Sequence, residues 1–581
     1  MLRVLLSWAL VLPQRLPPRL SSLPRGSEIV YPLAAVLVPA LLFLIGLGAY
    51  PLRDTNEGLY AEIAREMLAT GHYLVPHLNG VPYIEKPPLL YWLACAAMAV
   101  LGPTPVAVRL ASALPMLGLC LGIFRFGRHH LGAAVACYAS VALASMVPVA
   151  LLAHLVMFDA LLTALLGGWM LCFLHAHLSG SPAARRAGAV LLGLAVLEKG
   201  GVALVLALGV LLLFLLSGRD RGRDRECDRR GCRLRFDAAA LALFLAVVLP
   251  WHVLAAFRQD GFAWFYVVNE HVLRFLGRRQ PDDFHRGPVW FYLPQLLLML
   301  MPWTPFLILL ARRRPWGDPV RRTTVRFCQA ALLFPLLFFS LSQAKADYYL
   351  VVCAPAMALW LALVLEQALA RPPGLRLACC WGGALACCLV LLVALPGAED
   401  RVWTPVALAL LCLAWLALIP VAARGFLALT SPRVRECALL AIVVLALPMV
   451  TALADRGSAR AARESSLRIA QIVREEARPG TQVFIYRDFE DSFSSLPFYL
   501  GHIVPVIDSA SRDLLFGCGI APGKACIDHV QFLRRSRAGP VAVAVQERRR
   551  DAFLAMAGPG WRSEAVGDKI VFFNEVFTTR N

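Results

Sequence analysis

Stretches of about 17 to 25 mostly apolar residues recur along nearly the whole 581-residue chain. A bilayer core about 30 Å thick takes about 20 helical residues to cross, so these stretches predict transmembrane helices rather than a soluble core. The mean hydropathy of +0.65 agrees. We therefore predict a polytopic α-helical membrane protein with about 12–14 transmembrane helices. The expected spans are 29–49, 107–124, 131–150, 155–177, 201–217, 237–257, 288–311, 327–342, 347–369, 375–395, 403–423 and 435–453, with shorter segments at 89–101 and 187–198.

The formal charge of +19 is concentrated in short connectors between these spans. Residues 218–236 hold eight Arg against four acids, and residues 312–326 hold six Arg against one Asp. Such clusters orient a membrane protein, so the charge does not indicate a nucleic-acid partner. We expect these two loops and 424–435 to be cytoplasmic. Counting helices then places 258–287, 343–346, 396–402 and everything after residue 454 on the opposite side.

A polar segment at residues 53–92 follows the first span, where charged side chains are costly unless they function or lie in water. Asp54 and Glu57 are three residues apart, which places both carboxylates on one side of a helical turn. One hypothesis makes either of them a general base at the membrane surface. The alternative is structural, with Asp54 or Thr55 capping a helix that runs to Met67.

Several cations interrupt or border the apolar runs and favour an anionic ligand. Lys86 follows Glu85 and precedes two prolines that fix the backbone, so it is a candidate phosphate ligand or, alternatively, an interfacial anchor. Cations that converge from separate loops can each donate a charge-assisted hydrogen bond to phosphate. The other candidate donor-phosphate ligands are Lys199, Arg274 and Lys345, with Tyr348 and Tyr349 beside the last of these.

Asp159 is the acid placed deepest in an apolar run, and we group it with the catalytic candidates. A buried carboxylate requires a partner to stay ionised, and Lys86 or Lys199 could provide it. Glu85 and His271 are candidate metal ligands, with His72 or His77 as further donors, but their scattered spacing is a weak metal signal. We expect no required cofactor, and a divalent metal is the only one that the residues suggest.

The composition changes after residue 454. Residues 455–581 predict a small α/β domain, with strands at 482–486, 541–545 and 569–573. Cys518 and Cys526 flank a segment rich in Gly and Pro that can turn the chain back. Because the charge count places this domain outside the cytoplasm, we predict a disulfide between them.

The polar segment also carries a family resemblance. The motifs Asn56-Glu57-Gly-Leu-Tyr60-Ala-Glu-Ile, Tyr83-Ile-Glu85-Lys86-Pro87 and Asn269-Glu270-His271 occur here in the order and spacing typical of one family. Over about residues 45–370 the chain resembles the bacterial polyprenyl-phosphate-dependent glycosyltransferases, including the aminoarabinose transferases of lipid A. It resembles the protein O-mannosyltransferases more distantly. All of these have the C-type glycosyltransferase (GT-C) fold.

The resemblance implies roles for individual residues. It places the catalytic acidic pair on the Asp54–Glu57 stretch, the phosphate-binding lysine on Lys86, and supporting polar groups on Asp159, Lys199 and Arg274. It implies metal ligation by Glu85 and His271. The chain departs from the family at Asn56, where an Asp is usual, and at Leu59, where an Arg is usual. Aminoarabinose specificity therefore does not follow from the resemblance.

The resemblance implies an inner-membrane enzyme that moves a sugar from a polyprenyl-phosphate carrier to a lipid, polysaccharide or protein acceptor on the outer face. The expected partners are this donor, the acceptor and membrane lipids. The alternative is an ion-coupled secondary transporter, because buried charges and the interruption at Lys199-Gly200-Gly201 also occur in such carriers. The absence of an inverted repeat in the sequence favours the enzyme.

Overall fold

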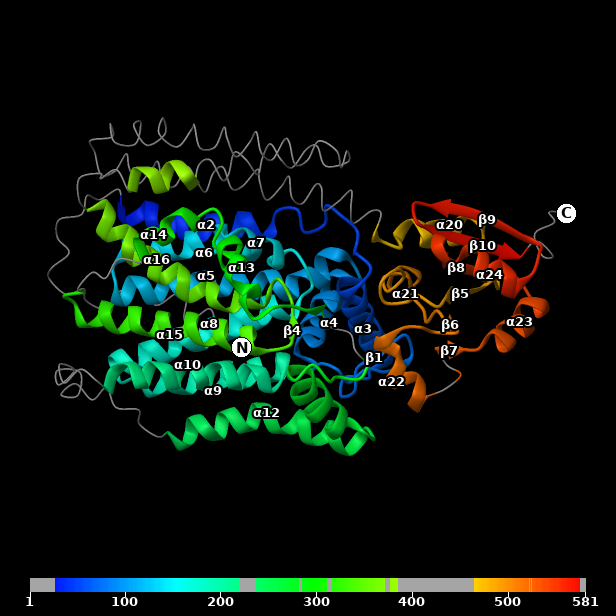
Figure 1. Ribbon diagram of the computed structural model, residues 1–581, viewed down its shortest axis with the longest axis horizontal. Coiled ribbons are helices and arrows are strands. Elements are labelled where there is room, and N and C mark those ends of the chain that lie inside the picture. Colours follow the sequence, from blue (N-terminus) through cyan, green and yellow to red (C-terminus); the bar gives the residue numbers. More distant parts are fainter. Residues whose placement is uncertain are drawn as a thin grey trace.

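The computed structural model describes residues 27–219, 237–281, 285–310, 316–370, 377–384, 464–521, 523 and 525–574. The described chain forms a bundle of long helices with a smaller α/β domain at one end (Figure 1). This arrangement places the soluble part of the chain against one end of the apolar part.

Six described helices are long and apolar enough to cross a membrane, and a bent pair would make a seventh. The multi-pass α-helical architecture is therefore confirmed. The six are α5 (Pro105–His130), α8 (Phe158–Ser179), α10 (Gly201–Arg219), α12 (Ala238–Arg258), α15 (Pro319–Leu341) and the continuous η4 (Tyr349–Cys353) and α16 (Ala354–Leu369). Shorter apolar helices are α2 (Ser27–Leu44), α4 (Leu89–Leu101) and α9 (Pro182–Lys199).

Two predicted spans are wrong as continuous helices. The span at 131–150 is divided into α6 (Ala133–Ser145) and α7 (Val147–Ala153), which meet at an angle of 68°. The span at 288–311 is divided into short helical segments, because Pro302 and Pro305 lack the N–H groups that a continuous helix needs. These segments are η2 (Val289–Phe291), α13 (Tyr292–Met299), η3 (Thr304–Phe306) and α14 (Leu307–Leu310). The predicted spans 403–423 and 435–453, and most of 375–395, lie outside the described residues.

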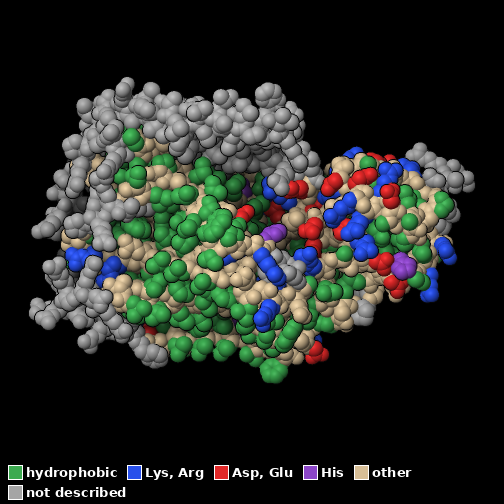
Figure 2. All heavy atoms as spheres, viewed as in Figure 1, with side chains coloured by type: hydrophobic (Ala, Val, Ile, Leu, Met, Phe, Trp, Pro, Cys, Tyr) green, Lys and Arg blue, Asp and Glu red, His purple; other side chains and the backbone are tan. Residues whose placement is uncertain are grey.

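Apolar side chains cover the helical part of the face shown in Figure 2, whereas charged side chains gather on the small domain and at its junction with the bundle. Helix α12 shows the same pattern in detail. Its leucines 241, 243, 245, 249 and 254 and Phe257 are all exposed. Exposed apolar side chains on a long helix suit contact with lipid.

The small domain is built on a six-stranded sheet of order β7-β6-β5-β8-β10-β9. Strands β5 to β8 pair in parallel around β5, and β10 pairs antiparallel with β8 and β9. The three predicted strands are confirmed as β5, β8 and β10. The strands are β5 (Gln482–Tyr486), β6 (Val506–Ile507), β7 (Cys526–Ile527), β8 (Val541–Gln546), β9 (Trp561–Val566) and β10 (Lys569–Asn574). The helices are α20 (Leu467–Glu476), α21 (Leu496–Leu500), α22 (Arg512–Ile520), α23 (His529–Ala538), η5 (Glu547–Arg549) and α24 (Arg550–Ala557).

The predicted disulfide is present. Cys518, near the end of α22, is bonded to Cys526 in β7, with their Cα atoms 5.9 Å apart. Helix α22 packs closely on the β1–β2 segment: at Gly517 there is no room for a side chain, since an added Cβ would lie 2.6 Å from the carbonyl oxygen of Pro82. The disulfide therefore links the helix that contacts the membrane domain to strand β7 of the sheet.

The polar segment 53–92 lies at this junction (Figure 1). It contains helix α3 (Asn56–Thr70) and the short hairpin β1 (His77–Leu78) and β2 (Val81–Pro82). Two further elements lie near it, the π-helix η1 (Trp264–Leu273) and the pair β3 (His285–Arg286) and β4 (Ala344–Lys345). Phe516 of α22 contacts Phe265 of η1, with ring centroids 4.7 Å apart. The described parts of 258–287, 343–346 and the domain after residue 454, which the charge count assigned to one side, thus meet at one end of the bundle, whereas 396–402 lies outside the described residues.

Candidate active site

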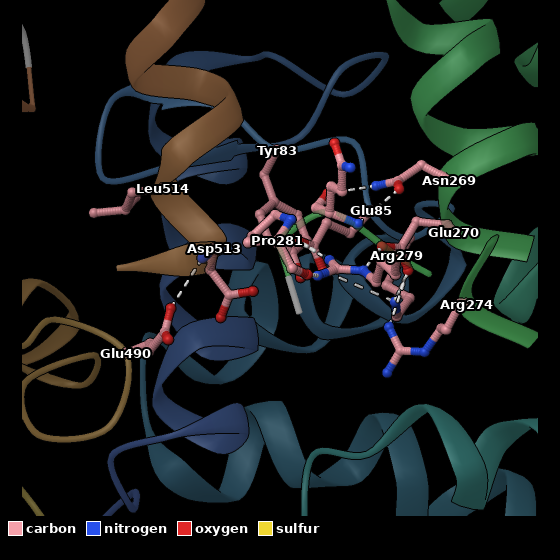
Figure 3. A network of polar contacts seen from close by, with 12 residues as sticks. Tyr83, Glu85, Asn269, Glu270, Arg274, Arg279, Pro281, Glu490, Asp513 and Leu514 are labelled. Carbon is pink, nitrogen blue, oxygen red and sulfur yellow. Dashed lines mark hydrogen bonds and ion pairs between the residues drawn. The ribbon is translucent and has the colours of Figure 1, made fainter. Parts of the chain in front are cut away.

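Three cations converge on the carboxylate of Glu270 in η1. Figure 3 shows two of them, Arg274 and Arg279, beside it. Lys86 Nζ and Arg274 Nη1 each lie 3.1 Å from Glu270 Oε2, and Arg279 pairs with Oε1. Burial raises the pKa of Glu270, but Lys86, Arg274 and Arg279 together outweigh it and hold this pKa below its ordinary value. Two predicted phosphate ligands, Lys86 and Arg274, therefore meet on a carboxylate that stays ionised.

Glu85 extends this cluster. Its Oε1 lies 2.7 Å from Arg279 Nη2, and its Oε2 lies 4.0 Å from Lys86 Nζ. Three cations and two carboxylates leave the cluster with a net positive charge. The side chains of Lys86 and Arg274 are 17% and 23% exposed, whereas that of Arg279 is fully buried. An anion could therefore reach the first two cations while Arg279 holds the carboxylates in place.

A second ion pair lies nearby at the interruption between α9 and α10. Lys199 Nζ is 2.6 Å from Asp159 Oδ1, so Asp159 pairs with Lys199 rather than Lys86. The same ammonium lies 4.8 Å from the ring centre of Tyr349. Burial and the charge of Asp159 raise the pKa of Tyr348, whereas the charge of Arg274 lowers it. The structure thus places the Lys199–Asp159 pair beside Tyr349, the neighbour of Tyr348 in the chain.

Lys345 has different surroundings. Its Nζ donates to the carbonyl oxygens of Phe339 and Ser340, each at 2.8 Å, and the residue is only 4% exposed. It also lies 5.3 Å from the ring centre of Tyr292. These contacts tie β4 to the end of α15, so Lys345 is engaged by backbone rather than by the cation cluster.

Glu85 and His271 do not form a metal site as arranged. His271 Nδ1 donates to the carbonyl oxygen of Tyr266 at 2.6 Å, and Nε2 accepts from the Gly201 amide at 2.9 Å. Both ring nitrogens are thereby used, and the Glu85 carboxylate is paired with Arg279. The donor set does not fit a metal ion without breaking these contacts, so we derive no step through one.

Asp54 points away from the bundle into the small domain. Its carboxylate lies 2.5 Å from Lys569 Nζ and accepts from Ser495 N and Oγ at 2.7 and 2.8 Å and from Ser466 Oγ at 2.9 Å. The residue is 2% exposed. Asp54 therefore joins α3 to β10 of the small domain.

Glu57 points in another direction. It forms a two-pronged pair with the fully buried Arg109 of α5, at 2.8 and 3.0 Å. The expected placement of both carboxylates on one side of a turn is wrong, because Asp54 pairs with Lys569 and Glu57 pairs with Arg109. The capping alternative is wrong as well, since Thr55 makes no side-chain capping bond and Asp54 is occupied. Neither carboxylate contacts a predicted phosphate ligand, whereas Asp159 does.

Helix α3 also carries Asn56 and Tyr60, and the ring of Tyr60 packs on those of Tyr91 and Phe158. Tyr60 Oη donates to Asn56 Oδ1 at 3.3 Å. Burial raises the pKa of Tyr60, and Tyr91, Tyr348, Asp513 and Glu85 raise it further. Asn56, the departure from the family pattern, lies one helical turn from Tyr60 and accepts its hydrogen bond.

Three residues of the site were missed in the sequence. Glu270 stands in a motif that supported the resemblance but was given no role, and Arg279 lies in the loop 258–287, in which only His271 and Arg274 were singled out. Asp513 comes from α22 of the small domain, where its backbone N–H donates to Glu490 at 2.9 Å (Figure 3). Nothing in the sequence around Asp513 indicated that it approaches the membrane domain.

Apolar helices thus end in a partly exposed cluster of cations beside a small α/β domain, an arrangement that suits an anionic ligand. Comparison with known proteins agrees. Residues 85–254 match the family model of dolichyl-phosphate-mannose-protein mannosyltransferase. The chain is also similar to two proteins named undecaprenyl phosphate-alpha-4-amino-4-deoxy-L-arabinose arabinosyl transferase. The one from Aeromonas hydrophila is 32% identical over 331 residues, and the one from Pseudomonas aeruginosa is 34% identical over 340.

These matches cover 55% and 57% of this chain and 57% and 58% of the two relatives, so the chain spans less than two thirds of their length. The crystal structure of ArnT from Cupriavidus metallidurans bound to undecaprenyl phosphate has a TM-score of 0.67 at 23% identity. It covers 95% of this chain and 98% of that one. The GT-C fold is thereby confirmed, and over part of its length the chain is similar to the aminoarabinose transferases.

Proposed function

We propose that this chain is an integral inner-membrane glycosyltransferase that takes a sugar from a polyprenyl-phosphate carrier and transfers it to a lipid acceptor. The observation that carries this proposal is the cluster of Lys86, Arg274 and Arg279 on Glu270. It gathers three cations, it is open at Lys86 and Arg274, and it lies where apolar helices end. The names of the relatives support the donor class, and the sugar is a hexose or a pentose.

Transfer from such a donor needs stabilisation of the leaving phosphate. The acceptor oxygen would attack the anomeric carbon while the bond between that carbon and the phosphate oxygen breaks, so the phosphate leaves with the electron pair. Lys86, Arg274 and Lys199 would balance the charge that grows there. A single displacement of this kind inverts the anomeric centre. The acceptor proton would pass to a carboxylate.

Among the predicted catalytic carboxylates, Asp159 is the one paired with a predicted phosphate ligand. Asp54 and Glu57 would act by holding α3, and hence Asn56 and Tyr60, against the cluster. We also propose that the small domain lies on the outer face of the membrane. The Arg-rich composition of the connectors 218–236 and 312–326 and the disulfide of α22 support that orientation.

The test uses the purified protein in proteoliposomes with lipid-linked sugars extracted from its own membranes. An enzyme releases free polyprenyl phosphate, which mass spectrometry detects. A secondary transporter would move solute and leave the total lipid-linked sugar unchanged, and this result would overturn the proposal. Lys86→Ala should lose the release, whereas Arg286→Ala, which removes an exposed charge on β3 outside the cluster, should keep it.

A further inference from the structure

Three histidines meet at the end of the bundle opposite the cation cluster. His129 and His130 close α5, and His175 lies near the end of α8. Their ligand atoms all lie within 4.8 Å of one another. His175 is sixteen residues beyond Asp159 on the same helix, about 24 Å along its axis. The triad is therefore separate from the proposed active site.

The same end of the bundle carries the basic side chains that flank the apolar helices. Arg185 and Arg186, just after α8, lie 3.6 and 3.5 Å from Asp237 at the start of α12. Helices α5 and α8 pack against each other. The triad thus connects the ends of two packed spans at the surface that the Arg count assigns to the cytoplasm.

The geometry is close to that of a three-imidazole metal site. His130 Nε2 lies 2.8 Å from His175 Nδ1, and the ring of His129 lies 4.4 Å from that of His130 and 5.3 Å from that of His175. Ligand nitrogens about 2.0–2.1 Å from a tetrahedral ion are about 3.3 Å apart. Small rotations of the three rings reach that spacing. A hydrogen bond between His130 and His175 alone does not account for the third ring.

We propose that His129, His130 and His175 bind a zinc-class divalent transition-metal ion that links the ends of α5 and α8. Imidazole nitrogen suits Zn²⁺, Cu²⁺ and Ni²⁺, whereas Mg²⁺ and Ca²⁺ prefer oxygen ligands. His129 is exposed, which leaves a route for the ion and a fourth position for water.

The test measures metal binding directly and needs no activity. Chelator-treated protein in detergent is titrated with Co²⁺, whose visible absorption bands report four-coordinate nitrogen ligation, and Zn²⁺ is counted after dialysis. The parent should hold one equivalent that His130→Gln and His175→Gln lose or bind at least tenfold more weakly. His177→Gln is the matched control, because this ring on the same helix packs on Phe173 and Phe214 instead.

His175→Cys separates ligation from folding. A thiolate that replaces the imidazole should keep the bound Co²⁺ and add a sulfur-to-cobalt charge-transfer band. Equal Co²⁺ and Zn²⁺ binding in the parent, His130→Gln and His175→Gln would overturn the proposal. So would equal loss in His177→Gln, or an absence of the charge-transfer band in a folded His175→Cys protein.

Discussion

The pair between Asp54 and Lys569 gives the most decisive test of how α3 is held. Both side chains are almost fully buried, at 1% and 3% exposure, and their charged atoms are 2.5 Å apart. Asp54→Asn keeps the shape and most hydrogen bonds of the carboxylate but leaves the Lys569 ammonium buried without its counter-charge. Breaking a buried pair in this way costs about 3–5 kcal/mol.

The reverse change should cost less. In Lys569→Met the carboxylate of Asp54 keeps its bonds from Ser495 and Ser466, so we expect the lower end of that range, about 3 kcal/mol. The double variant removes both charges and should recover most of the loss, since replacing a buried pair as a whole is often close to neutral. The difference between the double variant and the sum of the single ones is then the coupling of the two residues.

Thermal unfolding in detergent, followed by protease sensitivity of the small domain, provides the measurement. Glu476→Gln is the matched control, because its pair with Arg562 is exposed on both sides and should be worth about 0–1 kcal/mol. An unchanged melting curve for Asp54→Asn together with a turnover lowered by about 10²- to 10⁴-fold would refute this reasoning. That result would restore Asp54 as the base.

Four further outcomes are expected. Lys86→Ala should weaken polyprenyl-phosphate binding more than Lys86→Arg, which keeps the charge; equal binding by the Ala variant and the parent would make Lys86 an interfacial anchor. Glu57→Gln should lower the melting temperature by leaving Arg109 buried and unpaired, at a cost of about 3–5 kcal/mol, and an unchanged melting curve would contradict this. Reduction of the Cys518–Cys526 bond should destabilise the small domain by about 2–3 kcal/mol, because the closed loop is short; peptide mapping under non-reducing conditions checks the linkage, and two free thiols would refute it. Gly200→Ala should reduce donor binding, because the new Cβ would lie 2.3 Å from His271 Nε2 at a φ of +73°, and parent-like binding would show that His271 is free to move.

The sequence predicted well what depends on local pattern. Hydropathy predicts helices α5, α8 and α12, and strand periodicity predicts β5, β8 and β10, because each signal lies within one segment. Cations at Lys86 and Arg274 were identified because charge is rare beside apolar runs. The expected span at 288–311 was wrong because its prolines divide it into short helical segments.

What the sequence could not predict is which charge pairs with which. Asp54 and Glu57 are three residues apart, yet one pairs with Lys569 and the other with Arg109. Pairing of this kind is decided by contacts between distant segments, and local spacing carries no information about it. The same holds for Asp513, which only the packing of α22 on the β1–β2 hairpin brings to the site.

The ion pair between Asp54 and Lys569 also determines when, during synthesis, the polar segment can be joined to the small domain. The two residues are 515 positions apart, and at a synthesis rate of about 5–20 residues per second the ribosome needs about 25–100 s to travel from one to the other. During that time the apolar helices can insert and Glu57 of α3 can pair with Arg109 of α5, but the anchor of this segment in the small domain is missing. A nascent chain that stops before β10 would therefore reach the membrane with its helices in place and its polar segment not yet joined to the small domain.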